Sequence, residues 1–356
     1  MSRPAAFLDR DGTINVDKGY LCDVEQLELI PGSAEAIVRL NEAGWLVIVV
    51  SNQSGIARGL IEPEQLEQVN RRLAQMLAEQ GARIDRFYHC PHLPDGKVEQ
   101  YAMECGCRKP ATGMIDQACL DFQIDLEASL MFGDKLSDVG LGRGCAVSAV
   151  LLLSGMGIAN LEHLREHGGP LPQRVAGDLA QGVDWALSTD RIRRSPRKAQ
   201  SKIVDLPGAA AAIEQLQRSG RRAAVALGAF DLLHIGQLRY LQMAAALCDE
   251  LYVGLYSDEL AKERLDSWRP LEPLEVRKEL VAHLQCVDRV FVVDRPGPTD
   301  ALLALKPDIL AIRPGNDDEF RESARQCGAA VEVCGTRVDP LTSEVIRSIK
   351  MRMNRQ

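Results

Sequence analysis

Short apolar segments alternate with amphipathic segments along nearly the whole chain, and this alternation restricts the folds that the chain can adopt. The apolar segments contain few polar residues, as expected of strands buried on both faces of a sheet. The segments between them repeat their apolar residues at helical spacing and end at glycine. Strands that alternate with helices predict an α/β fold with a mainly parallel sheet. The first strands are expected at residues 5–9, 45–52, 129–134 and 149–153, and the clearest helices at 33–44 and 63–81.

The alternation stops and restarts, which predicts two domains. It fades after about Leu187 and resumes at about Ile203. The intervening residues 188–202 are basic and polar and contain proline, so we interpret them as an exposed linker; a docking arm for an acidic partner is the alternative. We therefore predict two Rossmann-like α/β domains, at residues 1–187 and 203–356. The strands of the second are expected at 222–231, 251–258, 289–294, 308–314 and 330–335.

Composition excludes several classes of protein. The net charge of -8 and the pI of about 5.4 argue against a general nucleic-acid binder. No apolar stretch is long enough to cross a membrane, and the N-terminus lacks a signal sequence, so we expect a cytoplasmic location and no membrane partner. The ten cysteines are scattered except for one tight group, which favours a reducing compartment and one metal site. The sequence leaves open whether the chain forms a homo-oligomer.

Two carboxylates follow the first predicted strand. Asp9 and Asp11 lie two residues apart, at a strand end where chemistry gathers in an open α/β sheet. Asp9 is suited to attack phosphorus, and Asp11 is suited to protonate the leaving oxygen and then to activate water. Gly12 permits a tight turn. A strand-to-loop turn capped by aspartate is the alternative for this run alone.

Three further segments favour phosphoryl chemistry. Ser51 and Asn52 end the second predicted strand, where a hydroxyl and backbone N–H groups can hold phosphoryl oxygens. Arg108 and Lys109 supply two cations for a dianion. Asp134 follows the strand at 129–134, and with Asp9 and the backbone carbonyl of Asp11 it would form an oxygen-rich site suited to Mg²⁺.

Together these four segments resemble the motifs of the haloacid dehalogenase (HAD) superfamily of phosphatases over about residues 5–155. The resemblance implies a Mg²⁺-dependent phosphatase with Asp9 as nucleophile and Asp11 as general acid and base. Ser51 would be the phosphate-binding hydroxyl, in a place where related phosphatases usually have threonine. Lys109 would stabilise charge at the transition state, and Asp134 would bind Mg²⁺ with Asp138 supporting it.

The one tight group of metal-ligand residues predicts a structural zinc site. Three thiolates and one imidazole make a closed tetrahedral set, which would stabilise a polar loop that cannot bury a core of its own. The alternative is an incidental grouping of these residues. The set directly precedes Arg108, so we expect it to position the two cations. Its members are Cys90, His92, Cys105 and Cys107.

The zinc set and the segment after Asn52 narrow the resemblance to sugar bisphosphate phosphatases of that superfamily that act on heptose. This resemblance implies that Arg58 and Arg108 help to hold a phosphorylated sugar. Histidinol-phosphate phosphatases share the zinc set, so a substrate of that kind is the alternative.

The start of the second domain suggests nucleotide chemistry. A run from Gly228 to Gln237 follows the apolar strand residues 222–227 and leads into a helix, whose N-terminal amides attract anions. It resembles the H-x-G-H element of the cytidylyltransferase-like nucleotidyltransferases over about residues 203–350. The resemblance implies nucleotide contacts, with ATP as a co-substrate, at Phe230, His234, Gln237, Arg277 and Arg313.

The second domain also departs from that family. Gln237 replaces the second histidine and carries no charge, whereas Asp266 and Glu344 place acids where the family has a basic residue and a hydroxyl. Like charge weakens phosphate binding. One hypothesis is therefore an enzyme that removes a sugar phosphate and then transfers a nucleotide to the product. The other is a phosphatase whose second domain only binds a ligand or aids assembly, with His234 as a helix cap.

Overall fold

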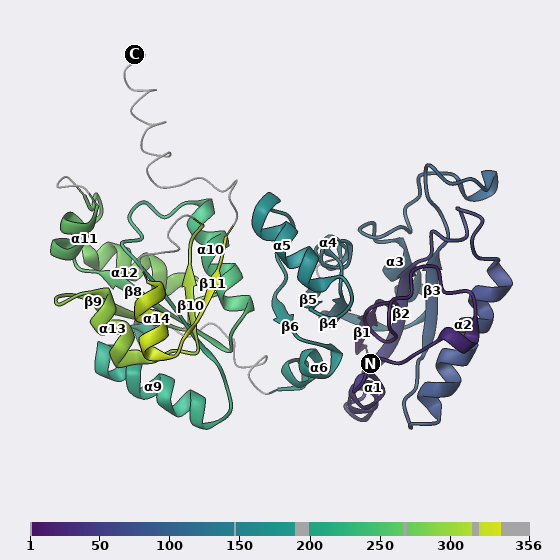
Figure 1. Cartoon of the computed structure of the whole chain (residues 1–356), viewed down its shortest axis with the longest axis horizontal. Coiled ribbons are helices and arrows are strands. Elements are labelled where there is room, and N and C mark those ends of the chain that lie inside the picture. The colour runs from purple at the N-terminus through teal and green to yellow at the C-terminus, as the bar shows by residue number, and fades with distance from the viewer. Residues whose placement is uncertain (1, 146, 189–198, 266–268, 315–319, 336–356) are drawn as a thin grey trace, which may run out of the picture. The chain divides into compact units, whose positions relative to one another are not determined.

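The computed structural model describes residues 2–145, 147–188, 199–265, 269–314 and 320–335 (Figure 1). The chain divides into two compact units, residues 1–162 with 172–193 and residues 163–171 with 194–356. Each unit has its own parallel sheet with helices around it, which confirms the predicted α/β class. None of the described helices is long and apolar enough to cross a membrane.

The first unit is built on a six-stranded sheet in the order β3-β2-β1-β4-β5-β6, and every neighbouring pair is parallel. The chain runs outward from β1 to one edge and then returns beside β1 to build the other half. The strands are β1 (Arg3–Leu8), β2 (Leu46–Asn52), β3 (Arg86–Cys90), β4 (Ile124–Gly133), β5 (Ser148–Leu152) and β6 (Arg174–Ala176).

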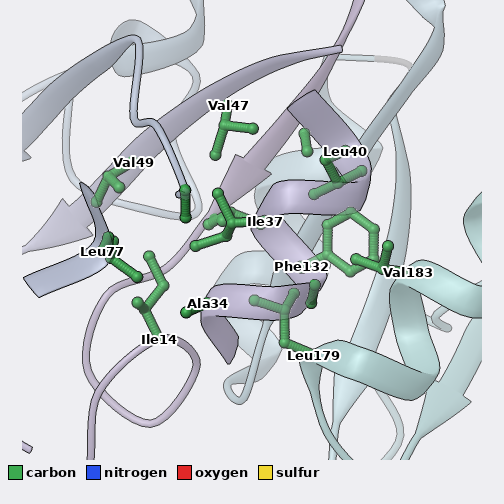
Figure 2. Packing of buried hydrophobic residues seen from close by; sticks show 14 of the residues in the cluster. Ile14, Ala34, Ile37, Leu40, Val47, Val49, Leu77, Phe132, Leu179 and Val183 are labelled. Atoms are coloured by element: carbon green, nitrogen blue, oxygen red, sulfur yellow. The ribbon is translucent and has the colours of Figure 1, made fainter. Parts of the chain in front are cut away.

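Apolar side chains from helices and strands form the core of the first unit (Figure 2). Ile37 and Leu40 lie one turn apart on α1, so they share the face that packs on the sheet. They meet Phe132 of β4 and Val183 of α6. The helices are α1 (Ser33–Glu42), α2 (Pro63–Ala78), α3 (Gly113–Asp121), α4 (Leu136–Gly144), α5 (Gly157–His167) and α6 (Leu179–Leu187), with short 3-10 turns at η1 (Val24–Gln26) and η2 (Glu99–Tyr101). Only the first half of α5, up to Glu162, is assigned to this unit.

Two strands of this sheet were not predicted from the sequence. β3 (RFYHC) and β6 (three residues) are the outer strands of the sheet. An edge strand is paired on one side only, so it need not be a continuous apolar run, and a search for buried strands misses it. β4 also begins at Ile124, earlier than the expected residue 129, because its first half is only partly buried.

The second unit has a five-stranded parallel sheet in the order β11-β10-β7-β8-β9. All five strands predicted for this half of the chain are present. They are β7 (Ala223–Gly228), β8 (Glu250–Tyr256), β9 (Arg289–Val293), β10 (Ile309–Ile312) and β11 (Ala330–Val333).

Helices alternate with the strands of the second unit, as the periodicity predicts. The expected linker 188–202 lies largely outside the described residues, but its last four residues form a helical turn, α8 (Ala199–Lys202). The other helices are α9 (Leu206–Arg218), α10 (Ile235–Ala246), α11 (Asp258–Arg264), α12 (Leu274–His283), α13 (Pro298–Leu305) and α14 (Arg321–Cys327).

Candidate active site

The sheet of the first unit brings polar residues from three strand ends to one edge. Asp9 directly follows β1, Ser51 lies near the end of β2, and Asp134 directly follows β4. These strands are parallel neighbours, so their carboxyl ends meet. The strand order reverses between β1 and β4, which is where ligands bind in open α/β sheets.

Lys109 joins two of the carboxylates in this cluster. Its Nζ lies 2.9 Å from Asp9 Oδ1 and 2.6 Å from Asp138 Oδ1, and it donates to the carbonyl of Val50 at 2.8 Å. All three charged residues are at most 4% exposed. Burial lowers the pKa of Lys109, but the charges of Asp138 and Asp9 outweigh it and the pKa rises, so the ammonium stays charged.

Asp9 is held as a carboxylate. Burial raises its pKa, but the charges of Lys109 and Lys135 and a hydrogen bond from Lys109 outweigh burial, so the pKa lies below its usual value. Lys135 Nζ is 3.8 Å from Asp9 Oδ2. A buried, ionised carboxylate at a strand end is suited to nucleophilic attack.

Asp134 is fully buried, and only one of its two carboxylate oxygens accepts a hydrogen bond from a described residue. Its Oδ2 accepts from the backbone N–H of Met156 at 2.8 Å. Its Oδ1 makes no hydrogen bond to any described residue, although Lys135 Nζ lies 3.6 Å away. Burial raises the pKa of Asp134 to about 7 despite the charge of Lys135. A buried carboxylate oxygen without a hydrogen bond is suited to a cation.

Three carboxylates fit a metal ion at this edge. Ligand oxygens of Asp9, Asp134 and Asp138 all lie within 4.8 Å of one another, and all three side chains are buried. Burial raises the pKa of Asp138 to about 6, against the lowering effect of Lys109. Buried carboxylate oxygens gathered in this way match the preference of Mg²⁺ for oxygen ligands.

Asp11 has hydrogen-bond donors on every side. Arg10, which is 1% exposed, donates from Nη2 at 2.9 and 3.0 Å and from Nε at 3.1 Å. Asn15 Nδ2 and Gln53 Nε2 each donate at 2.9 Å. Arg10 also donates to Asn70 Oδ1 of α2. The local sequence pattern assigns no role to Arg10, Asn15 or Gln53, because nothing in it shows that their side chains turn towards Asp11.

Two of the predicted substrate-binding residues, Ser51 and Asn52, contact side chains or backbone of this cluster. Ser51 is 4% exposed and accepts a hydrogen bond from Gln53. Asn52 makes two hydrogen bonds with the backbone of Lys109, at 3.0 and 3.1 Å, so its amide holds the lysine in place. Whether Asn52 also contacts substrate stays a prediction. Arg108 donates to the carbonyl of His92 at 3.2 Å.

Arg58 has a buried nitrogen that no described residue satisfies. Its side chain is half-buried, and its Nε makes no hydrogen bond to any of the residues placed in the structure. The preceding carbonyl, of Ala57, accepts from the backbone N–H groups of Lys97 and Val98 at 2.7 and 2.9 Å. The loop that carries Arg58 is thus fastened to the polar loop at residues 93–104.

The four predicted zinc ligands come together. Their neighbouring ligand atoms are separated by 3.3 to 3.7 Å, and all lie within 4.8 Å of one another. Four ligands about 2.3 Å from a zinc ion at tetrahedral angles would be roughly 3.8 Å apart, so the spacing fits a closed site. The atoms are Cys90 Sγ, His92 Nδ1, Cys105 Sγ and Cys107 Sγ.

The second unit also places predicted residues at a strand-order reversal, between β7 and β10. His234 is the N-cap of α10, and its Nδ1 accepts from the backbone N–H of Gly236 at 3.2 Å. Gln237 lies in the first turn of α10 and is 5% exposed. Arg313 follows β10 and is half-buried. Phe230 stacks on Tyr240, with ring centroids 6.3 Å apart.

Arg277 is in a different setting from the other predicted nucleotide contacts. It is fully buried, and its guanidinium donates to the carbonyls of Glu272, Ala229 and Tyr256 and to Asp258 Oδ1. As described, it fastens the ends of β7 and β8 together. A nucleotide contact by Arg277 stays a prediction. Asp266 and Glu344 lie outside the described residues.

Comparison with known protein families gives matches in both halves of the chain. A polynucleotide kinase 3 phosphatase model matches residues 16–139, and a HAD-hydrolase-like model matches residues 106–181. A cytidylyltransferase-like model matches residues 225–352. The two kinds of match fall in the two units, so the family signals divide along the chain as the sheets do.

Individual relatives match the first half. D-glycero-D-manno-heptose-1,7-bisphosphate 7-phosphatase of Thermosynechococcus vestitus is 43% identical over 189 residues, which are 52% of this chain and 96% of that protein. D-glycero-beta-D-manno-heptose-1,7-bisphosphate 7-phosphatase of Escherichia coli is 46% identical over 204 residues, 56% of this chain and 98% of that protein. A solved D,D-heptose bisphosphate phosphatase from B. bronchiseptica is 32% identical, with a TM-score of 0.46 over 52% of this chain and 98% of that one.

Proposed function

Because the chain belongs to the family of HAD-like D-glycero-D-manno-heptose-1,7-bisphosphate 7-phosphatases, we propose that its first unit hydrolyses the 7-phosphate ester of this heptose bisphosphate and releases heptose 1-phosphate. The observation that supports the proposal most directly is the buried cluster at the carboxyl ends of β1, β2 and β4. There an ionised Asp9 lies beside the Lys109 ammonium, 2.9 Å away.

The proposed reaction has two steps. Asp9 attacks phosphorus, so that a bond from its carboxylate oxygen to phosphorus forms while the sugar ester bond breaks. Asp11, carrying a proton, gives it to the departing sugar oxygen. Water then attacks the aspartyl-phosphate and gives a proton to Asp11, which releases inorganic phosphate and restores Asp9.

Basic and polar side chains would hold the phosphoryl group during both steps. Ser51 would donate its hydroxyl to a phosphoryl oxygen, and Lys109 would offset negative charge as it develops. Arg58 and Arg108 would bind the rest of the phosphorylated sugar, and the buried Nε of Arg58 is a donor that has no acceptor among the residues placed in the structure.

HAD phosphatases generally use Mg²⁺. In this chain we assign the ion to Asp9, Asp134 and the backbone carbonyl of Asp11, with Asp138 nearby. The assignment is supported by the Asp134 oxygen that accepts no hydrogen bond from any described residue. The bound cation would reduce the repulsion between the carboxylates and the phosphate dianion. The Cys90, His92, Cys105 and Cys107 set would hold a structural Zn²⁺, because it offers four ligands and leaves no position for substrate.

Asp9→Asn tests the covalent mechanism. An amide is a poor nucleophile, so we expect phosphate release to fall by at least about 10³-fold. The change is nearly isosteric, so the zinc content and the thermal unfolding midpoint should stay close to those of the unchanged protein. Phosphate release would be measured with Mg²⁺ on heptose 1,7-bisphosphate and on histidinol phosphate. Appreciable turnover by the variant would reject the aspartyl-phosphate, and a preference for histidinol phosphate would reject the sugar.

The cytidylyltransferase-like unit gives a second candidate function, transfer of a nucleotide to the released heptose 1-phosphate. The position of His234 and Arg313 at the strand-order reversal supports it. The uncharged Gln237 in place of a histidine instead favours a unit that binds a ligand or aids assembly. Full-length protein given heptose 1,7-bisphosphate and ATP, and then CTP, separates the two. Pyrophosphate together with phosphate supports transfer, and phosphate alone with both nucleotides supports the second.

A further inference from the structure

Gln53 connects two groups of the proposed mechanism. Its Nε2 donates to Asp11 Oδ2 at 2.9 Å and to Ser51 Oγ at 2.8 Å. The three residues are at most 8% exposed, so water offers them few alternative partners. The orientation of the amide follows from its neighbour, because the reverse orientation would place an amide oxygen against the carboxylate of Asp11.

The hydrogen bond from Gln53 limits the directions in which the Ser51 hydroxyl can donate its hydrogen. A hydroxyl has one hydrogen to donate. Because Ser51 Oγ accepts from Gln53, its own hydrogen is directed elsewhere, and no acceptor for it is found among the described residues. The hydroxyl is thereby prepared to donate to an oxygen that arrives with the substrate.

The other bond ties Asp11 to the strand that carries Ser51. Arg10 and Asn15, which are close to Asp11 in the sequence, donate hydrogen bonds to its carboxyl group. Gln53 donates to the same group from the end of β2. The backbone N–H of Gln53 donates to the carbonyl of Cys90 at 2.8 Å, which fixes the start of the side chain. The side-chain amide of Gln53 thus links Asp11 to Ser51 and limits the distance between them.

We propose that Gln53 is a positioning residue of the phosphatase site. It orients the Ser51 hydroxyl as a donor to a phosphoryl oxygen and holds the carboxyl group of Asp11 beside the same phosphoryl group. This inference rests on the proposed function, in which Asp11 moves protons and Ser51 binds phosphate. It assigns to Gln53 no contact with the substrate.

The test compares Gln53→Met, which keeps the length of the side chain and removes its N–H donors, with the unchanged full-length protein. We expect kcat/KM on heptose 1,7-bisphosphate, which reports the steps up to departure of the leaving group, to fall roughly 10- to 100-fold. On p-nitrophenyl phosphate, whose leaving group departs without a proton, the loss should be several-fold smaller. When Ser51→Ala is added, the combined loss should be clearly less than the product of the two single losses, because both changes disable one hydroxyl.

Two results would overturn the proposal that Gln53 positions both Asp11 and Ser51. Equal losses on the two substrates would show that Gln53 does not act through Asp11, and multiplicative losses in the double variant would show that it does not act through Ser51. Gln53→Leu, which also lacks the donors and adds no charge, gives the same two readouts if the Met variant folds poorly. Gln75→Met, on the exposed face of α2, is the matched control and should keep full activity.

Asp9→Asn is measured beside these variants so that the two proposals fail differently. If the unchanged protein releases no phosphate from heptose 1,7-bisphosphate, the proposed function is wrong. If Asp9→Asn still turns over, the aspartyl-phosphate mechanism is wrong, and the role of Gln53 is wrong with it. If Asp9→Asn is inactive while the Gln53 variants give equal or multiplicative losses, only the role of Gln53 is wrong.

Discussion

At the scale of single residues, the site is organised by donors placed around buried carboxylates. Lys109 lies between Asp9 and Asp138, and Arg10 binds Asp11 with two of its nitrogens. A buried charge is costly unless it is paired and hydrogen-bonded, so the pairing with Lys109 keeps Asp9 ionised for nucleophilic attack. Arg58 is the contrasting case, because its buried Nε has no acceptor among the described residues.

Arg58→Ala tests whether that nitrogen is kept for substrate. A charge-assisted hydrogen bond to phosphate contributes about 1.5–3 kcal/mol, so we expect KM for the heptose bisphosphate to rise by roughly 10- to 100-fold. The value of kcat should change less. Steady-state kinetics of phosphate release provides the measurement, with Arg71→Ala on the exposed face of α2 as the control. An unchanged KM would mean that Arg58 does not bind substrate.

At the scale of elements, the turn after β1 depends on the absence of a side chain at Gly12. The residue has φ of +83°, and a Cβ there would lie 2.3 Å from Asp134 Oδ2. Gly44 has a similar φ of +79° but has nothing within 4 Å of the equivalent position. Substitutions at the two glycines should therefore cause similar backbone strain, but only a substitution at Gly12 should displace a residue of the site.

We predict that Gly12→Ala and Gly44→Ala lower stability to a similar extent, but that Gly12→Ala lowers the phosphatase activity much more. Each should lower the free energy of unfolding by about 1–2 kcal/mol through the left-handed backbone. Gly12→Ala alone should also lower kcat, by about 10-fold or more, because Asp134 must move. Thermal unfolding and phosphate release would be measured on both. Equal activity of the two variants would show that the close approach of Gly12 to Asp134 is unimportant.

The predicted zinc ligands lie on a loop that leads directly into Arg108 and Lys109, so we expect the phosphatase site to depend on them. Cys107→Ser should lower the zinc content below one ion per chain and lower stability by on the order of 3 kcal/mol or more. Turnover should also fall, because Cys107 directly precedes Arg108 and Lys109. Metal analysis and thermal unfolding would follow the loss. The exposed Cys119→Ser is the control. A variant that keeps its zinc would remove Cys107 from the ligand set.

At the scale of the whole molecule, the two candidate sites are on separate sheets. We predict that His234→Ala weakens ATP or CTP binding at least about 10-fold, because it removes a group at the start of α10. Phosphate release should stay within about twofold of the unchanged protein. Titration calorimetry on the full chain, together with phosphate release, gives both numbers. A parallel loss of phosphatase activity would show that the sites are coupled, and no nucleotide binding by the unchanged protein would favour an assembly role.

Much of this organisation was predictable from the sequence by itself. The alternation of apolar strands and amphipathic helices predicted two parallel α/β sheets, and the polar residues after each strand predicted where Asp9, Ser51 and Asp134 would meet. The physical reason is that parallel strands place their carboxyl ends at one edge, so a local pattern has a fixed consequence in space. The spacing of the Cys and His set likewise predicted that its members gather.

Only the tertiary structure decided the contacts that organise the site in detail. The bonds from Gln53 to Asp11 and from Arg10 to Asn70 join residues 42 and 60 positions apart. The full burial of Arg277 is equally invisible in its local segment. Such contacts depend on strand register, on helix placement and on side-chain rotamers, none of which local periodicity encodes. The sequence thus determined which residues reach the site, and the packed structure decided which of them hold one another in place.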